Sequence, residues 1–324
     1  MKLTITQNRI ISLLFRSGSL SRKELAAELS LSKAALTFAT RPMMEEGILL
    51  PAGEKEEKKV GRREEMLRLN SDYGSFLGID IRRHNFYFSL TDFAGKAIAF
   101  DVAKSEKEAT RTLENIQKEH HVLAISVLMR QKANPEVLAL RYPLFHGALA
   151  QTNRPWIVEN NVQALARIYA FYHEENRNFL LIKYGPGLGS AIYVNGDLLG
   201  SYSELGHAYV GDKPLEEQIS FSALLGEDAE EIDGAKAILQ NDSHLSFLIE
   251  KLSFGLYNAI QLLHLEKIVL SGVLLSERKA KEMLWKRLGR FESDAALPEL
   301  VHYPSYSETN EIKGSIRAFL LFNS

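Results

Sequence analysis

The chain has 324 residues, 45% hydrophobic and 25% charged, which is the composition of a globular protein with two or three domains. No apolar run approaches the roughly 20 residues of a membrane helix, and residues 1–9 lack a signal-peptide core, so we expect a cytoplasmic protein without membrane partners. The absence of cysteine excludes disulfides and thiolate metal sites.

The charge is unevenly distributed along the chain. Residues 1–70 contain 13 Lys and Arg against 9 Asp and Glu, a net charge of +4, whereas the remainder carries 26 against 32, a net charge of −6. A basic end on an acidic body is typical of a protein that contacts nucleic acid with one end.

Residues 6–48 predict three short helices in the order of a helix-turn-helix domain. Apolar residues are spaced at helical intervals in the first of them, Gln7–Phe15. Ser21 and Glu24 form a capping-box pattern at the start of the second helix, and Ser32 is the expected N-cap of the third. In a helix-turn-helix, the second helix of the motif lies in the DNA major groove.

The third helix is the expected recognition helix, and its N-terminal half is expected to contact bases. We expect phosphate contacts from Ser21 and Arg22. The other candidate DNA-contacting residues in and around this helix are Ser32, Lys33, Ala34, Ala35, Thr37, Phe38 and Arg41. Pro42 falls inside the helix, where a proline costs roughly 3 kcal/mol, so a kink or break is expected at Thr40-Arg41.

A wing is predicted after the recognition helix. Ile48–Leu50 is a short strand, Glu54–Lys59 a charged tip and Met66–Leu69 a returning strand. Arg62 and Arg63 on this wing could enter a minor groove, where a narrow width concentrates negative potential. The alternative is a small structural domain whose arginines are simply solvated.

From residue 76 onward, the chain predicts two α/β lobes of similar design with a cleft between them. Asn195-Gly196 is a two-residue hairpin signal in the second lobe. Strands are expected at Phe76–Ile81, Phe86–Thr91, Ala97–Val102, Phe179–Tyr184, Ala191–Val194 and Lys267–Gly272, and helices at Asn161–Tyr172 and Leu248–Leu263.

Several motifs resemble the ROK family (repressors, open reading frames, kinases), and specifically its transcriptional regulators. In chain order they are Ser21–Ala26, Leu31–Ala34, Gly61-Arg62, Gly78–Asp80, Thr91–Gly95, Glu159–Asn161 and Glu204–His207. The resemblance implies an actin-like, ribonuclease-H-like body, dimeric or tetrameric, with a sugar or sugar phosphate in the cleft. We expect a winged helix-turn-helix at residues 1–70, a first α/β lobe at 71–176 and a second lobe, for effector binding and dimerisation, at 177–324.

The family's catalytic and metal-binding motifs are altered. Asp80 is followed by bulky residues instead of the glycines that admit a nucleotide phosphate. Asn161 stands where the family has its aspartate general base, and an amide cannot take up that proton. His207 is not followed by the family's zinc-binding cysteines, and Pro214 stands where the last of them would fall. We therefore expect no kinase activity, no metal and no cofactor.

Some sugar-binding positions of the family remain. Asn160, Glu204, His207 and Glu216 match them, and Asn161 replaces the aspartate, so these five are the candidate effector-binding residues. His207 could equally be an ordinary hydrogen-bonding histidine.

The sequence thus predicts a DNA-binding regulator, a repressor of sugar-related genes, that binds a double-stranded operator as a homodimer or homotetramer. Two alternatives stay open: a sugar kinase that also binds DNA, and a regulator of this family without a ligand.

Overall fold

A computed structural model describes residues 3–54, 65–130, 133–200, 204–226, 229–263, 265–291, 300–304 and 312–324. The chain divides into two compact units, of which unit 1 comprises Met1–Asn161 and Ile312–Ser324 and unit 2 comprises Val162–Glu311. The predicted division at residue 176 differs in two ways: Val162 and Tyr169 pack with Phe179 and Leu181 and so belong to unit 2, and the C-terminal segment returns to the first α/β region instead of completing the second.

Unit 1 begins with a winged helix-turn-helix, which we call the head. Its elements are α1 (Ile5–Ser17), β1 (Ser19–Ser21), α2 (Arg22–Glu28), α3 (Lys33–Glu45), β2 (Leu49–Glu54) and β3 (Glu65–Leu69). The three strands form an antiparallel sheet in the order β1-β3-β2, so the two predicted strands of the wing are confirmed. The tip, including Gly61, Arg62 and Arg63, lies outside the described residues.

Local capping interactions begin the helices of the head where the sequence predicts. The Ser21 hydroxyl accepts a hydrogen bond from the Glu24 amide, and the Glu24 carboxylate accepts one from the Ser21 amide, which completes the capping box of α2. Ser32 caps α3 in the same way through the Ala35 amide. These bonds satisfy amide donors that a helix start leaves without partners.

The expected break of the recognition helix at Thr40-Arg41 is wrong, because α3 continues as one helix through Pro42; a kink there stays a prediction. Tertiary packing explains this difference. Met43 and Thr40 on either side of the proline have no exposed surface, and the Thr40 hydroxyl donates to the Leu36 carbonyl one turn earlier. Burial of this face offsets the lost hydrogen bond of the proline.

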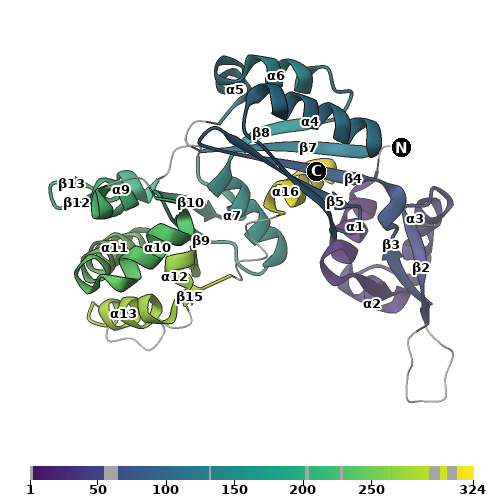
Figure 1. The fold of residues 1–324 in the computed structure, drawn as a ribbon. Helices are drawn as coiled ribbons and strands as arrows, with labels where there is room; N and C mark the ends of the chain where they lie inside the picture. Colours follow the sequence, from purple (N-terminus) through teal and green to yellow (C-terminus); the bar gives the residue numbers. More distant parts are fainter. Residues whose placement is uncertain are drawn as a thin grey trace. The chain divides into compact units, whose positions relative to one another are not determined.

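The first α/β region of unit 1 is a five-stranded sheet in the order β6-β5-β4-β7-β8. Its elements are η1 (Ser71–Tyr73), β4 (Ser75–Arg82), β5 (Asn85–Asp92), β6 (Ala97–Ala103), α4 (Glu106–Glu119), β7 (Val122–Met129), α5 (Pro135–Arg141), α6 (Pro143–Ala150) and β8 (Trp156–Asn160). β4, β7 and β8 run parallel, whereas β5 and β6 are antiparallel to their neighbours. Helices α4, α5 and α6 lie above this sheet in Figure 1.

The C-terminal helix α16 (Lys313–Phe322) lies on the opposite face of the same sheet (Figure 1). It crosses β4 so closely that a Cβ atom added to Gly78 would lie 2.2 Å from the Gly314 carbonyl carbon. The hydroxyl of Ser126 donates to the Gly314 carbonyl (2.7 Å), and Ser89 and Ser315 share a buried hydrogen bond (2.8 Å). Two facing glycines thus permit a backbone contact that any side chain would prevent.

The same helix connects the sheet to the head. The rings of Phe15 in α1 and Phe319 in α16 are stacked with centroids 3.8 Å apart. At the end of the chain, the Asn323 amide donates to the Asn8 carbonyl (3.0 Å) and to the Ser12 hydroxyl (2.6 Å). Residues more than 300 positions apart therefore hold α1 against the body within unit 1.

Unit 2 repeats the hairpin-and-crossover design around a second five-stranded sheet, in the order β11-β10-β9-β14-β15. The strands of that sheet are β9 (Phe179–Tyr184), β10 (Leu188–Val194), β11 (Asp197–Leu198), β14 (Lys267–Ser271) and β15 (Val301–His302). In the same unit, β12 (Tyr209–Val210) and β13 (Lys213–Pro214) form a separate two-stranded sheet. Its helices are α7 (Asn161–Tyr172), η2 (Leu205–His207), α8 (Leu215–Ile219), α9 (Phe221–Leu225), α10 (Glu231–Gln240), α11 (Asp242–Leu263), α12 (Val273–Ser276) and α13 (Arg278–Leu288).

The predicted two-residue turn in unit 2 is confirmed. Asn195 and Gly196 have φ angles of 54° and 87°, and Val194 pairs with Asp197 across the turn. Positive φ at both central residues is what this hairpin type requires.

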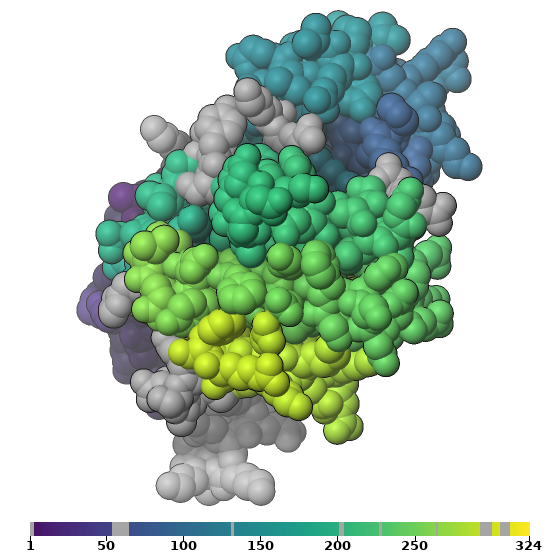
Figure 2. Space-filling model, turned by 90° about the vertical axis from the view of Figure 1, so that its left-hand side faces the viewer, coloured from purple at the N-terminus to yellow at the C-terminus, as the bar shows by residue number. Residues whose placement is uncertain are grey.

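The atoms of unit 2, coloured green to yellow, form a continuous surface on the side shown in Figure 2.

Among the residues that the structure describes, none of the helices has the length and apolar character needed to cross a membrane.

Candidate functional site

The N-terminal half of α3 presents an exposed face. Of the residues predicted to contact DNA, Ser32, Lys33, Ala34, Ala35, Thr37, Phe38 and Arg41 are all exposed. Leu36, Ala39 and Met43 are buried and pack the opposite face of the helix into the head. The buried face of the recognition helix therefore anchors it in the head, and its exposed face is not needed for packing.

Ser21 and Arg22 have structural roles at the start of α2. Ser21 has no exposed surface, so the prediction that its side chain contacts a phosphate is wrong; burial in the capping box is the reason. The Arg22 guanidinium donates to the Thr40 hydroxyl (2.8 Å) and to Glu65 (2.9 Å), which ties α2 to α3 and β3. A phosphate contact by Arg22 stays a prediction, as do the contacts by Arg62 and Arg63.

A cluster of charged side chains in unit 1 lies where β4 and β8 end beneath α16. The Lys313 ammonium is 2.8 Å from Asp80 Oδ2, and the Arg82 guanidinium is 2.7 Å from the same oxygen. One turn further along α16, Arg317 forms an ion pair with Glu159. Lys313 is 2% exposed and Arg317 7%, so both cations are held inside the protein.

The sequence reasoning missed these cations. Lys313 and Arg317 are four residues apart in a C-terminal segment that is otherwise uncharged, so they share one helical face. Two cations on the buried face of a short helix require carboxylate partners, because an unpaired charge in the interior is very costly. That spacing is the signal from which the cluster could have been inferred.

The ion pairs change the chemistry of the site to which Asp80 belongs. This aspartate is the position that, by resemblance, would serve nucleotide binding. Here its carboxylate is neutralised by an ammonium group of the chain itself, and the residues after it are bulky, as the sequence predicts. An internal ion pair leaves this carboxylate less available to an external cation or phosphate.

Unit 2 brings three of the five predicted effector residues together. Nε2 of His207 lies 3.5 Å from a Glu204 carboxylate oxygen and 4.0 Å from one of Glu216. The other Glu216 oxygen accepts a hydrogen bond from the Leu188 amide (3.1 Å) at the start of β10. His207 is 69% exposed, so its ring is accessible to a ligand hydroxyl. The remaining two candidates, Asn160 and Asn161, lie at the junction of β8 and α7 in unit 1, where Asn161 is buried.

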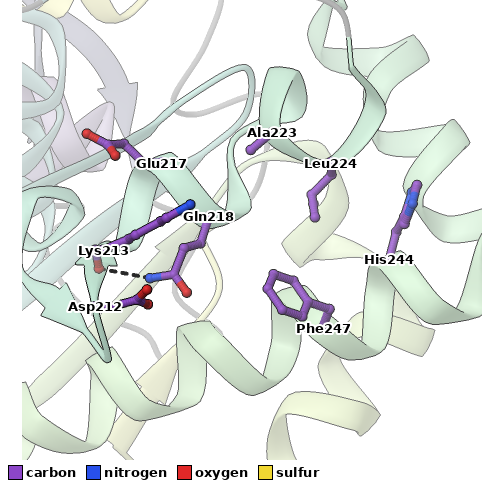
Figure 3. A pocket seen from close by; sticks show the side chains of 8 residues that line it. All are labelled: Asp212, Lys213, Glu217, Gln218, Ala223, Leu224, His244 and Phe247. Carbon is purple, nitrogen blue, oxygen red and sulfur yellow. Dashed lines mark hydrogen bonds between the residues drawn. The ribbon is translucent and has the colours of Figure 1, made fainter.

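A pocket of about 480 Å³ opens elsewhere in unit 2 (Figure 3). Its lining consists of Asp212, Lys213, Glu217, Gln218, Ala223, Leu224, His244 and Phe247. The Gln218 amide donates to the Lys213 carbonyl and thereby closes one wall onto the β12–β13 turn. None of the five predicted effector residues lines this pocket. Within the described part of the chain, no group of three His, Cys, Asp or Glu side chains is arranged to hold a metal ion.

Comparison with known proteins agrees with the geometry. A family profile described as winged helix-turn-helix DNA-binding matches residues 3–49. A crystal structure of a ROK family transcriptional regulator, a homologue of the Escherichia coli Mlc protein, superposes with a TM-score of 0.73 and 20% identity, covering 98% of this chain and 96% of that one. The resemblance to the ROK regulators is confirmed. The fold is a winged helix-turn-helix followed by a body with the fold of the ROK proteins.

Two further proteins show the range of relatives. A xylose repressor from Caldicellulosiruptor bescii is 25% identical over 242 residues, which are 64% of this chain and 57% of the repressor. The chain therefore matches little more than half the length of this curated relative. A ROK hexokinase from Thermus thermophilus shares the fold, with a TM-score of 0.58 and 16% identity over 76% of this chain. Regulators and sugar kinases thus both occur among the similar proteins.

Proposed function

We propose that this chain is a cytoplasmic DNA-binding transcriptional regulator that represses sugar-related genes. The observation that carries the proposal is the winged head, whose α3 exposes its N-terminal half while its other face is packed. The similarity to a xylose repressor supports the class of target genes. Lys33, Ala34, Ala35, Thr37 and Phe38 are the proposed major-groove residues, with Ser32 and Arg41 at the edges of this face.

The experiment that tests this proposal is selection of duplexes from a random-sequence pool with the purified full-length chain. We expect one enriched sequence with two related half-sites, because a homodimer or homotetramer presents two heads. Equal binding to all duplexes at physiological salt would contradict the proposal, since non-specific affinity comes from phosphate contacts alone.

The wing is proposed to add minor-groove contacts through Arg62 and Arg63. Replacing both with alanine should weaken operator binding and reduce the slope of log affinity against log salt by up to about 2, because each phosphate neutralised contributes roughly 0.9 to that slope. Quantitative gel-shift titrations at salt concentrations from about 50 to about 200 mM measure both the affinity and the slope, because binding depends steeply on salt in this range. The matched control replaces the exposed Arg141 and Arg278. An unchanged slope in the wing variant would remove the wing from the proposal.

We further propose that the chain does not transfer phosphate. The support is the buried Lys313–Asp80 ion pair together with Asn161 at the position of the family's general base. Sugar kinases among the similar folds favour the second candidate, a kinase that also binds DNA. Incubation with ATP and each common hexose decides between the two, and any sugar-dependent release of ADP would establish the kinase.

The proposed effector is a sugar or sugar phosphate that contacts Glu204, His207 and Glu216 in unit 2; contacts by Asn160 and Asn161 stay predictions. Carboxylates and an imidazole pair with hydroxyl groups that lose water on binding. In a dimer, an effector that binds better to one arrangement of the two heads would increase the fraction of molecules in that arrangement. It would thereby control the affinity for the operator.

Thermal-shift screening with sugars and sugar phosphates tests the effector. We expect one of these compounds to raise the unfolding midpoint of the wild-type chain, and His207→Ala to abolish that rise because it removes an exposed ligand contact without disturbing the core. His84→Ala, another exposed histidine, is the control. Absence of any shift across the screen would favour the ligand-free regulator.

A further inference from the structure

The exposed face of α3 is unusually apolar for a surface that enters a DNA groove. Phe38 is 85% exposed, and Ala34 and Ala35 one turn earlier on the helix are exposed as well. The Thr37 side chain is exposed as well, and its hydroxyl donates to the Lys33 carbonyl (2.9 Å), so the hydrogen of this group is used within the helix and the side chain also has a methyl group. Between Lys33 and Arg41, the exposed side chains of this face are therefore hydrophobic except for the Thr37 hydroxyl, whose hydrogen is already donated within the helix.

The fold gives no reason for an exposed phenylalanine at this position. Leu36, Ala39 and Met43 carry the packing of α3, and Phe38 belongs to the opposite face. A benzyl group in water is unfavourable, and burying it would contribute substantially to any complex that covers it. The ring is therefore placed for a partner that meets the recognition helix.

The chemistry of the major groove decides what that partner group is. Base edges there carry hydrogen-bond donors and acceptors, and the one apolar group among them is the C5 methyl of thymine. A phenyl ring placed over polar base edges would strip them of water without replacing their hydrogen bonds. Contact with thymine methyl groups avoids this penalty.

We propose that Phe38, together with Ala34 and the Thr37 methyl group, reads thymine methyl groups in each operator half-site. This inference rests on the proposed function, since it requires α3 to enter the major groove. It makes Phe38 a specificity-determining residue: positions opposite the ring must be T·A pairs, because a G·C pair presents no methyl group there.

Replacement of thymine by uracil in the DNA tests the inference, because it removes a methyl group and leaves base pairing intact. The probe is the duplex selected with the full-length chain, with uracil introduced at one thymine of both half-sites at a time. At one or two positions we expect binding to weaken by about fourfold per methyl lost. Phe38→Ala should weaken binding of the unmodified duplex by at least about tenfold, and uracil at the same positions should then have little further effect.

Leu140→Ala provides the matched control, because Leu140 is 84% exposed and lies on α5, outside the head. It should retain both the wild-type affinity and the sensitivity to uracil. Uracil without effect at every thymine, or an equal loss with wild-type and Phe38→Ala protein, would overturn the inference while leaving operator binding established. If selection yields no preferred duplex, the proposed function itself fails and the inference with it.

Discussion

Gly314→Ala should lower the free energy of unfolding by about 3 kcal/mol and the thermal midpoint by roughly 10 °C. A Cβ atom at this position would lie 2.7 Å from the Gly78 Cα and 3.1 Å from its carbonyl carbon. Both neighbours are backbone atoms of a central strand, so no side-chain rotation can relieve the overlap, and α16 must move away from β4. Thermal unfolding followed by circular dichroism measures the loss.

The same substitution at Gly147 is the control. Gly147 lies within helix α6, and an added Cβ there would meet nothing within 4 Å. Gly147→Ala should leave stability unchanged or raise it by up to about 1 kcal/mol, because alanine is the better helix former. Equal stability of the Gly314 and Gly147 variants would mean that α16 does not cross β4 as described.

Arg317→Met should lower the free energy of unfolding by about 3–5 kcal/mol, because it leaves the buried Glu159 carboxylate without its cation. Glu159 is 8% exposed, so water cannot replace the lost partner. Adding Glu159→Gln to the same chain should restore most of the loss, since a neutral amide is far cheaper to bury than a carboxylate that has lost its cation. Urea unfolding of the single and double variants measures both effects.

The exposed ion pair of Arg278 and Glu282 is the matched control for this prediction. Their side chains are 90% and 63% exposed, so Arg278→Met should leave the unfolding midpoint unchanged. A double variant as unstable as Arg317→Met alone would show that arginine packing, and not its charge, stabilises α16.

The helix starts of the head and one hairpin turn of unit 2 followed directly from local sequence patterns. Ser21, Glu24 and Ser32 begin helices through bonds to amides only three residues away, and Asn195-Gly196 forms its turn without help from distant residues. Such short-range chemistry can be predicted because the partners are neighbours in the chain. The predicted break at Pro42 does not occur, because the local preference was outweighed by burial of Thr40 and Met43.

The candidate effector residues illustrate a different limit. The sequence named Glu204, His207 and Glu216 through a family pattern, and the structure brings these three together in unit 2. The residues that neutralise Asp80 and Glu159 were not named, because Lys313 and Arg317 lie more than 150 positions away from either carboxylate. Pairing over such separations depends on how strands and helices are assembled.

By itself, the sequence determined the winged head and the two similar α/β regions, and it predicted the departures from the kinase pattern after Asp80 and at Asn161, because each of these is written in neighbouring residues or in a single side chain. Only the tertiary structure decided that the last helix belongs with the first sheet and that it carries two buried cations and clasps the head through Phe319 and Asn323. The physical reason is that the backbone contact between Gly78 and Gly314 and the buried ion pairs of Lys313 and Arg317 form between segments far apart in the sequence. Neither segment alone shows which partner it will meet.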